Sequence, residues 1–241
     1  MDVRRSSSGT KIKILHSAGI PAKGKITVDG IEVNQEKSSS IRQCLGYMLQ
    51  DSDNQMFMPT VYEDMIFGPL NYGKSGKEAD QLAREALEEL SLIHLKDRQN
   101  YKMPGGEKRM AAIATILTMN PKVMLMDEPS TALDPKNRRR LIRILQKLPT
   151  TKILATHDLD LVLETCDRVL VLNQGKLVAD GSVQDILWNR KLLEKYNLEL
   201  PFCLVGVPER FSEKGLEVSE IMEVNRKRKV SESTPKVQNV R

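Results

Sequence analysis

The chain has 241 residues and a formal net charge of +5, with 40% hydrophobic and 29% charged residues. This balance is that of a soluble globular protein, and the length allows one large domain or a domain with an appendage. No apolar stretch approaches the roughly 20 residues that cross a bilayer. The first residues, MDVRRSSSGTK, lack the apolar core of a signal peptide, so any role at a membrane is expected to be peripheral.

Cysteine and charge patterns indicate a cytosolic chain. Three widely spaced cysteines, Cys44, Cys166 and Cys203, form no CxxC pair, which indicates reduced thiols. The densest basic cluster is NRKRK at 225–229. Such a cluster is compatible with nucleic-acid or anionic-lipid contact, but a solvated tail is favoured and no nucleic-acid partner is expected.

The first predicted elements are a hairpin and a strand. GKITVDGIEV (24–33) alternates apolar and polar residues around Asp29-Gly30, which is typical of a β-hairpin. CLGYML (44–49) is a short apolar run that ends at Gln50 and predicts a strand.

Two helices follow in the prediction. Residues 75–92 begin with a capping box formed by Ser75 and Glu78. Their apolar stripe consists of Ala79, Leu82, Ala83, Ala86, Leu87 and Leu90. A second helix is predicted over 106–119, just after two glycines.

Strands and helices then alternate to about residue 200. The predicted elements are a strand at 123–126, a helix opened by Asp134-Pro135, buried strands at 152–156 and 168–172 with a helix-like segment at 159–166 between them, a hairpin at 173–181 and a helix near 183–195. Asp as N-cap and Pro in the first turn are a helix-start pattern. The alternation predicts an α/β domain with a mostly parallel core sheet.

Two adjacent carboxylates stand at the end of one predicted strand. In MLMDEPSTALD (124–134), Asp127 and Glu128 follow an apolar run of the kind that forms a strand covered on both faces. Open α/β sheets bind ligands at the carboxyl ends of their strands. One carboxylate there can hold a magnesium ion and the next can polarise a water molecule, which is hydrolase chemistry on a nucleotide.

The order of motifs over residues 50–181 resembles the ATPase subunit of an ABC transporter, and the resemblance extends over about 12–200. LQDSDNQMFMPTVYEDMIFGPLN (49–71) is similar, more narrowly, to the ATPases of cobalt and energy-coupling-factor importers. The resemblance implies a P-loop NTPase-like fold with a helical subdomain at about 70–118. It also implies ATP and Mg²⁺ as cofactors, a second ATPase subunit and an integral-membrane subunit as partners, and a peripheral place at the cytoplasmic face of the cell membrane.

The resemblance assigns roles to four residues at strand ends. Gln50 matches the glutamine that reaches magnesium and the attacking water, and Asp127 matches the magnesium-organising carboxylate. Glu128 matches the general base. His157, after an apolar strand, matches the switch histidine, which would hydrogen-bond the γ-phosphate and hold the water and Glu128 in register.

Residues 103–109, MPGGEKR, match the family's signature segment, which is usually L-S-G-G-Q. Its last four positions are occupied here by Pro104, Gly105, Gly106 and Glu107. Glycines before a helix leave backbone N–H groups open to an anion. Proline has neither a hydroxyl nor an N–H, so Pro104 in place of serine removes donors to phosphate. Asp134 matches the loop that contacts the opposite subunit.

The phosphate-binding loop G-x-x-x-x-G-K-[ST] has no complete match. GIPAKGKI (19–26) fits this pattern as far as Lys25, but Ile26 stands in place of the Ser or Thr. A strand pattern then follows where a helix is required. RRSSSGTKI (4–12) occupies the loop's place, with Gly9 and the displaced Lys11 as its remnant. The fold is therefore expected to lack the first core strand and the phosphate loop, and the isolated chain is expected to bind ATP very weakly.

Three interpretations stay open from the sequence. The chain is an importer ATPase whose amino end is missing, a degenerate subunit that completes a partner's ATP site, or an inactive remnant. The favoured function is the ATPase of a cobalt, nickel or vitamin importer, with residues 1–202 as an incomplete ABC ATPase domain. Residues 203–241 are predicted to form a partly disordered carboxyl-terminal extension.

Overall fold

The structure, a computed structural model, describes residues 26–33 and 36–205. These residues belong to two compact units, one ending at His157 and the other beginning at Asp158. The predicted boundary near residue 203 stays a prediction, because residues 206–241 lie outside the described part of the chain. Gly9 and Lys11 lie outside it as well.

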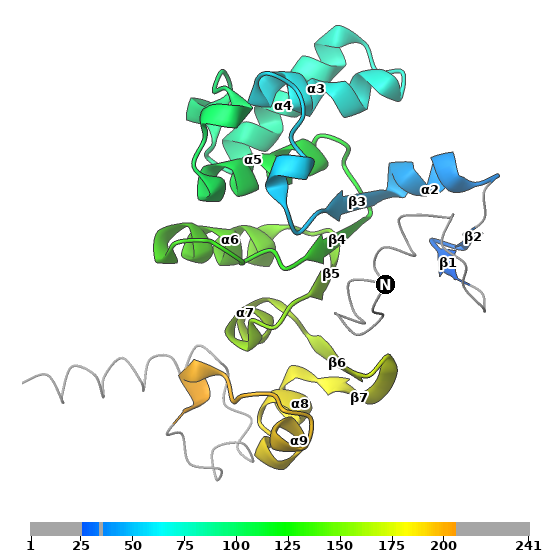
Figure 1. Ribbon diagram of the computed structural model, residues 1–241. Coiled ribbons are helices and arrows are strands. Elements are labelled where there is room, and N and C mark those ends of the chain that lie inside the picture. The colour runs from blue at the N-terminus through cyan, green and yellow to red at the C-terminus, as the bar shows by residue number, and fades with distance from the viewer. Residues whose placement is uncertain (1–25, 34–35, 206–241) are drawn as a thin grey trace, which may run out of the picture. The chain divides into compact units, whose positions relative to one another are not determined.

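A three-stranded parallel sheet forms the centre of the first unit (Figure 1). Its strands are β3 (Leu45–Met48), β4 (Val123–Asp127) and β5 (Thr151–Ala155), in the order β3-β4-β5. The middle strand is the most buried, and Met124, Leu125 and Met126 are each 0% exposed. The predicted parallel core is confirmed. β5 is less buried than predicted: Ile153 is 43% exposed, because alternate residues of this strand face solvent.

The connection from β3 to β4 carries a helical part made of α3 (Val61–Asn71), α4 (Gly76–Glu89) and α5 (Gly105–Leu117), which lie against one another (Figure 1). Three short 3₁₀ turns accompany them: η1 (Ser52–Asn54) precedes α3, and η2 (Ile93–Leu95) and η3 (Asn100–Lys102) lie between α4 and α5. α4 begins with the predicted capping box, in which Ser75 and Glu78 exchange side-chain and backbone hydrogen bonds. The predicted apolar stripe is its buried face, except that Leu82 is only half-buried.

α3 is absent from the sequence prediction. It starts with its own capping box, since Thr60 and Glu63 bond each other's backbone N–H groups. Pro69 stands in its last turn, where the helix is ending. The helical part therefore begins before residue 70. α5 begins at Gly105, one residue before the predicted start.

The remaining elements of the first unit follow the sequence closely. β1 (Thr27–Val28) and β2 (Ile31–Glu32) form the predicted hairpin. Its turn residues Asp29 and Gly30 have φ of 50° and 76°, the left-handed geometry of a tight two-residue loop. α2 (Ser38–Cys44) precedes β3, and α6 (Pro135–Lys147) joins β4 to β5.

The second unit contains an antiparallel hairpin, β6 (Arg168–Asn173) with β7 (Lys176–Ser182), after α7 (Leu159–Thr165). The predicted strand at 168–172 is confirmed as β6, but the prediction that it is buried is wrong. An apolar run alone does not show which face will be covered, and Leu170 on β6 is 56% exposed. The predicted turn within 173–181 is confirmed, with Gln174 and Gly175 at φ of 48° and 78°.

Two helices replace the single helix predicted near 183–195. They are α8 (Val183–Leu187) and α9 (Arg190–Lys195). The break occurs at Asn189, whose side chain accepts a hydrogen bond from the Leu192 N–H at 3.0 Å and so caps α9. A short 3₁₀ turn, η4 (Phe202–Leu204), ends the described residues. In the part of the chain that the structure describes, no helix combines the length and apolar character needed to cross a bilayer.

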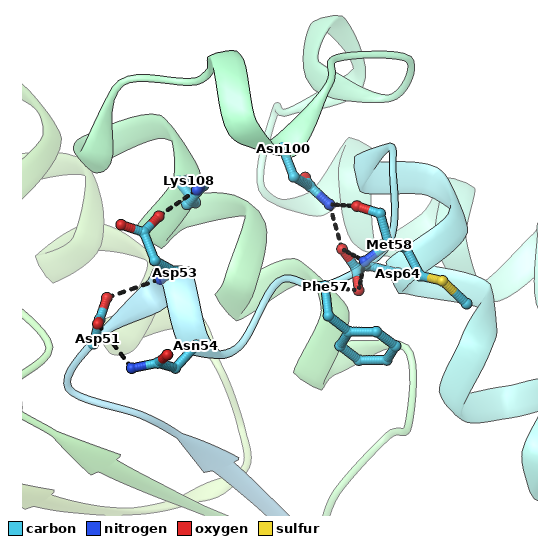
Figure 2. A network of polar contacts seen from close by, with 8 residues as sticks. All are labelled: Asp51, Asp53, Asn54, Phe57, Met58, Asp64, Asn100 and Lys108. Carbon is cyan, nitrogen blue, oxygen red and sulfur yellow. Dashed lines mark hydrogen bonds and ion pairs between the residues drawn. The ribbon is translucent and has the colours of Figure 1, made fainter.

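Asp64 on α3 is a buried carboxylate, 7% exposed, within the helical part (Figure 2). It accepts hydrogen bonds from the backbone N–H of Phe57 at 3.3 Å and of Met58 at 3.2 Å, and from the Asn100 amide. Burial raises its pKa above the ordinary 3.8, and these hydrogen bonds offset only part of that rise.

The pKa of Asp64 gives a test of this burial. A raised folded-state pKa means that the site's contribution to stability is fully present below the ordinary pKa and is lost as pH rises through the raised value. We expect Asp64→Asn to cost about 1–3 kcal/mol of unfolding free energy through lost acceptors. That cost should be smaller at neutral pH than in mildly acidic solution, as measured by urea unfolding of both proteins. A cost that grows with pH would show that the hydrogen bonds outweigh burial.

Candidate functional site

Three of the predicted site segments lie at one edge of the parallel sheet. Gln50 follows β3, Asp127 and Glu128 end β4, and His157 follows β5. Parallel strands in register bring their carboxyl ends together, and Asp127 is paired with Ala155, two residues before His157. The structure therefore assembles the four strand-end residues from chain segments about 30 to 80 residues apart, as parallel pairing requires.

Glu128 is fixed by both of its carboxylate oxygens. Oε2 accepts a hydrogen bond from the Thr156 hydroxyl at 3.0 Å, and Oε1 lies 2.8 Å from Nδ1 of His157. The Glu128 side chain is 20% exposed and that of His157 is 81% exposed. The carboxylate is thus sheltered while the imidazole beside it faces solvent. Thr156 is a site residue that the sequence prediction missed, although it stands beside His157.

The backbone of Glu128 is also constrained. Its φ is 49°, a left-handed conformation that is uncommon outside glycine. Its N–H donates to the Ala155 carbonyl at 2.8 Å, which extends the β4–β5 ladder by one residue. This conformation turns the chain out of the sheet while the side chain stays at the sheet edge.

Asp127 is buried, 7% exposed, at the end of the central strand. The pKa of Tyr47 on β3 is raised, mainly by burial of its hydroxyl and further by the negative charge of Asp127. The Asp127 carboxylate and the exposed Gln50 amide are both oxygen donors at one sheet edge. No group of three or more acidic, histidine or cysteine side chains among residues 26–33 and 36–205 could hold a metal ion by itself. Mg²⁺ commonly takes one or two carboxylates plus phosphate oxygens, so these residues fit a magnesium ion shared with a nucleotide.

Arg109 joins the two sides of this site and was not predicted. Its guanidinium donates to the backbone carbonyl of Glu128 at 2.6 Å and to the backbone carbonyl of Gln50. The residue is 5% exposed, and burial lowers its pKa while the charges of Asp51 and Glu128 act in the opposite direction. A cation in the apolar stretch of α5 was the available signal, because a buried arginine needs acceptors. Gln50 is thereby held through its backbone, which leaves its side-chain amide exposed.

The glycine turn, residues Pro104 to Glu107, forms the start of α5. Pro104 is the N-cap and its side chain makes no capping hydrogen bond. The Lys108 N–H donates to the Pro104 carbonyl at 2.9 Å, so it is the first intrahelical N–H of α5. The N–H groups of Gly105, Gly106 and Glu107 precede it and have no acceptor within the helix. A Cβ on Gly105 would meet nothing within 4 Å, so there is open space beside this residue. This arrangement can receive an anion.

Asp134 lies next to the glycine turn. A Cβ on Gly106 would come within 2.9 Å of the Asn137 amide nitrogen and 3.6 Å of the Asp134 carboxylate. Asp134 caps α6 by accepting from the N–H groups of Lys136 and Asn137 at 2.9 and 3.0 Å. These hydrogen bonds, that of Asn137 first, lower its pKa. Glu107 lies 3.7 Å from the Arg98 guanidinium in a weak surface ion pair.

Comparisons with known proteins agree with this arrangement. A family model described as ABC transporter matches residues 9–131. A provisionally named ABC transporter ATP-binding protein of Gloeobacter violaceus is 44% identical over 203 residues, covering 83% of both chains. The energy-coupling factor transporter ATP-binding protein EcfA of Methanothermobacter thermautotrophicus is 37% identical over 203 residues, which cover 81% of this chain and 65% of EcfA.

Solved structures show the same fold. The structure of cbiO1 from Clostridium perfringens, described as part of the ABC transporter complex cbiONQ, has a TM-score of 0.68 and 32% identity, with 81% of each chain covered. An ATP-binding cassette solved as a dimer in a post-hydrolysis state with ADP and Pi has a TM-score of 0.64 and 26% identity, covering 73% of this chain and 80% of that one. The chain therefore belongs to the family of ABC transporter ATP-binding subunits.

Proposed function

We propose that this chain is the ATPase subunit of an energy-coupling-factor type importer that carries a metal ion, cobalt or nickel, or a vitamin. The observation that carries the hydrolytic part is the placement of Glu128 at the end of β4, with its carboxylate bonded to Thr156 and His157. The likeness to EcfA and to cbiO1 supports the transporter class. The chain would work peripherally at the cytoplasmic face of the membrane, bound to an integral-membrane subunit.

The residues divide the chemical work in this proposal. Bound Mg–ATP would supply the phosphoryl group that water attacks, with Asp127 and Gln50 as the protein's oxygen ligands to the metal. Glu128 accepts the proton of the water at a carboxylate oxygen, because each oxygen keeps a lone pair beyond its present hydrogen bond. His157 donates through Nδ1 to Oε1 and faces solvent, and its Nε2 can donate to phosphate when the imidazole carries both protons. The Gln50 amide can both accept and donate, so it orients water without adding charge.

The glycine turn and the Asp134 loop serve the partner ATPase subunit in this proposal. The three N–H groups of Gly105, Gly106 and Glu107 would face the γ-phosphate held by the opposite subunit. Positive helix-end character favours an anion there. The cassette solved as a dimer supports a paired arrangement of such subunits.

The first prediction from the proposed function concerns the proposed general base. Glu128→Gln keeps the shape of the side chain but removes the group that accepts a proton. General-base catalysis contributes roughly 10²–10⁴ in rate, so phosphate release by the assembly that contains this chain should fall by about a hundredfold or more. ATP binding should persist, because the substitution leaves the metal ligands and the glycine turn in place.

Glu85→Gln is the matched control for this substitution. Glu85 is an exposed carboxylate on α4, a helix that carries none of the site residues, and it accepts a hydrogen bond from Gln81 at 2.6 Å. It should leave turnover unchanged. Turnover that also survives Glu128→Gln would show that this chain's carboxylate is not the working base and that the catalytic site belongs to the partner.

The second prediction concerns Pro104. Pro104→Ser would place a hydroxyl at the N-cap, where it can accept from the backbone of α5 and stabilise the helix by about 1 kcal/mol. Alternatively, the same hydroxyl can donate to phosphate, and a hydrogen bond to a charged group is worth about 1.5–3 kcal/mol. We expect the ATP concentration at half-maximal turnover of the assembly to fall by about tenfold.

Pro104→Ala separates the effect of the added hydroxyl from the effect of removing the proline ring. Like serine, alanine gives position 104 a backbone N–H and no ring, but it adds no hydroxyl. The serine variant should therefore bind more tightly than the alanine variant. Equal ATP dependence of both variants would contradict a phosphate contact at this position.

A further inference from the structure

The glycine turn is tied on its leading side to the segment that follows Gln50. Asn100 lies in η3, four residues before Pro104, and is 4% exposed. Its amide nitrogen donates to the Met58 carbonyl at 2.7 Å and to the Asp64 carboxylate, while Asp64 accepts from the N–H groups of Phe57 and Met58 (Figure 2). The Asn100 N–H also donates to the Pro59 carbonyl at 3.1 Å. The chain before the turn is thus bonded to residues 57–59 through backbone and side-chain groups.

The orientation of the Asn100 amide is determined by its surroundings. Both groups that face its nitrogen, the Met58 carbonyl and the Asp64 carboxylate, are acceptors only. A flipped amide would set its oxygen against both of them. The Asn100 Oδ1 atom is buried without a hydrogen-bond partner. Leaving a buried acceptor unsatisfied is destabilising. The side chain of Asn100 therefore stabilises this arrangement only through the two bonds donated by its amide nitrogen.

A second tie holds the trailing side of the turn. Lys108, the residue directly after the turn, forms an ion pair with Asp53 in η1 (Figure 2). Its side chain is 11% exposed, while that of Asp53 is 74% exposed. Asp53 itself is held by Asp51, which accepts from the Asp53 N–H at 2.9 Å and from the Asn54 amide at 2.8 Å. Residues 100 and 108 therefore bracket the turn, and both are bonded to the segment Asp51–Met58.

The same segment carries an exposed aromatic residue. Phe57 is 63% exposed and meets the ring of Phe67 on α3 edge-to-face, with ring centroids 4.9 Å apart. Its backbone N–H is one of the donors to Asp64. A displacement of Phe57 therefore disturbs the hydrogen bonds of Asp64, which also binds the Asn100 amide.

We propose that Asn100 and Lys108 are positioning residues, which tie the glycine turn to the segment Asp51–Met58 so that the two move together. A displacement of Phe57 is then passed to the three open N–H groups of the turn. The consequence for ATP hydrolysis rests on the proposed function, in which these N–H groups face phosphate. The mechanical tie itself does not depend on that function.

Amide hydrogen exchange of the full chain without nucleotide tests the tie. The reporter is the Lys108 N–H, the first of α5 with an intrahelical acceptor, together with the amides that follow it. Asp53→Ala and Asn100→Leu should each accelerate its exchange by about three- to tenfold, since the stabilities of directly bonded groups are coupled. Exchange in β4 should be unchanged. Asp53 is exposed, so Asp53→Ala keeps the test valid if Asn100→Leu fails to fold.

Asp80→Ala is the matched control, because it breaks an ion pair with Arg84, 2.7 Å long, and a hydrogen bond from the Tyr62 hydroxyl at 2.9 Å within the same helical part, and it touches neither tie. It should leave the reporter unchanged. Acceleration spread over the whole chain, no acceleration, or an equal effect of Asp80→Ala would overturn the proposal.

A double-mutant cycle tests whether Phe57 acts through the ties. Phe57→Ala removes the contact with Phe67 and should accelerate the reporter in the otherwise unchanged chain. In a chain that carries both Asp53→Ala and Asn100→Leu, the same substitution should add nothing. Independent, additive effects would contradict transmission through these residues. Because nucleotide is absent throughout, these outcomes stand whether or not Glu128→Gln abolishes hydrolysis.

Discussion

The site depends on one buried guanidinium. Arg109 projects from α5 and binds the backbone carbonyls of Gln50 and Glu128, the residues that follow two neighbouring strands. Burying a charge is costly unless it is well paired, and here the acceptors are two carbonyl dipoles with Asp51 and Glu128 nearby as charges. Removing the guanidinium would leave two carbonyls without their donor as well as a cavity. The helical part and the sheet edge are therefore held in one geometry by a buried group.

Glu128 shows what that geometry requires. A non-glycine residue at φ of 49° is strained by about 1–3 kcal/mol and persists only where its surroundings hold it. Four contacts do so: the N–H to Ala155, the carbonyl to Arg109, and the carboxylate to Thr156 and His157. The strain turns the chain away from the sheet directly after Asp127. Two adjacent acids can therefore take different environments, one buried in the strand and one at its rim.

Local rules predicted much of this fold. The capping box of Ser75, the N-cap of Asp134 and the Asp29-Gly30 turn each depend on neighbours in sequence, and the structure confirms all three. The family resemblance implied that His157 acts beside Glu128, and the parallel pairing of β4 with β5 brings these two side chains to 2.8 Å. The failures have physical causes. The apolar run at 168–172 does not show which of its faces will be covered. The helix predicted over 183–195 is broken at Asn189, because the side chain of this residue caps α9.

The contacts that tie the site together could not be predicted in this way. Arg109 binds carbonyls 19 and 59 residues away, and Asn100 binds Asp64 across 36 residues. Such bonds leave no period or spacing in a sequence, since they depend on how α3, α5 and the sheet pack. A polar residue in a predicted apolar helix is the sign that the sequence offers. It does not show which group that residue binds.

Pro104 affects how much the glycine turn depends on the residues that bracket it. The φ of −57° and ψ of 145° of Pro104 suit an N-cap, so proline fits the position without distorting α5. What the position loses is the hydroxyl, and an anion at the turn is then met by backbone N–H groups alone. Such groups bind well only where their directions are fixed beforehand, because ordering them on binding costs affinity. A turn without a capping hydroxyl therefore relies more on the residues that bracket it, which places the burden of orientation on Asn100 and Lys108.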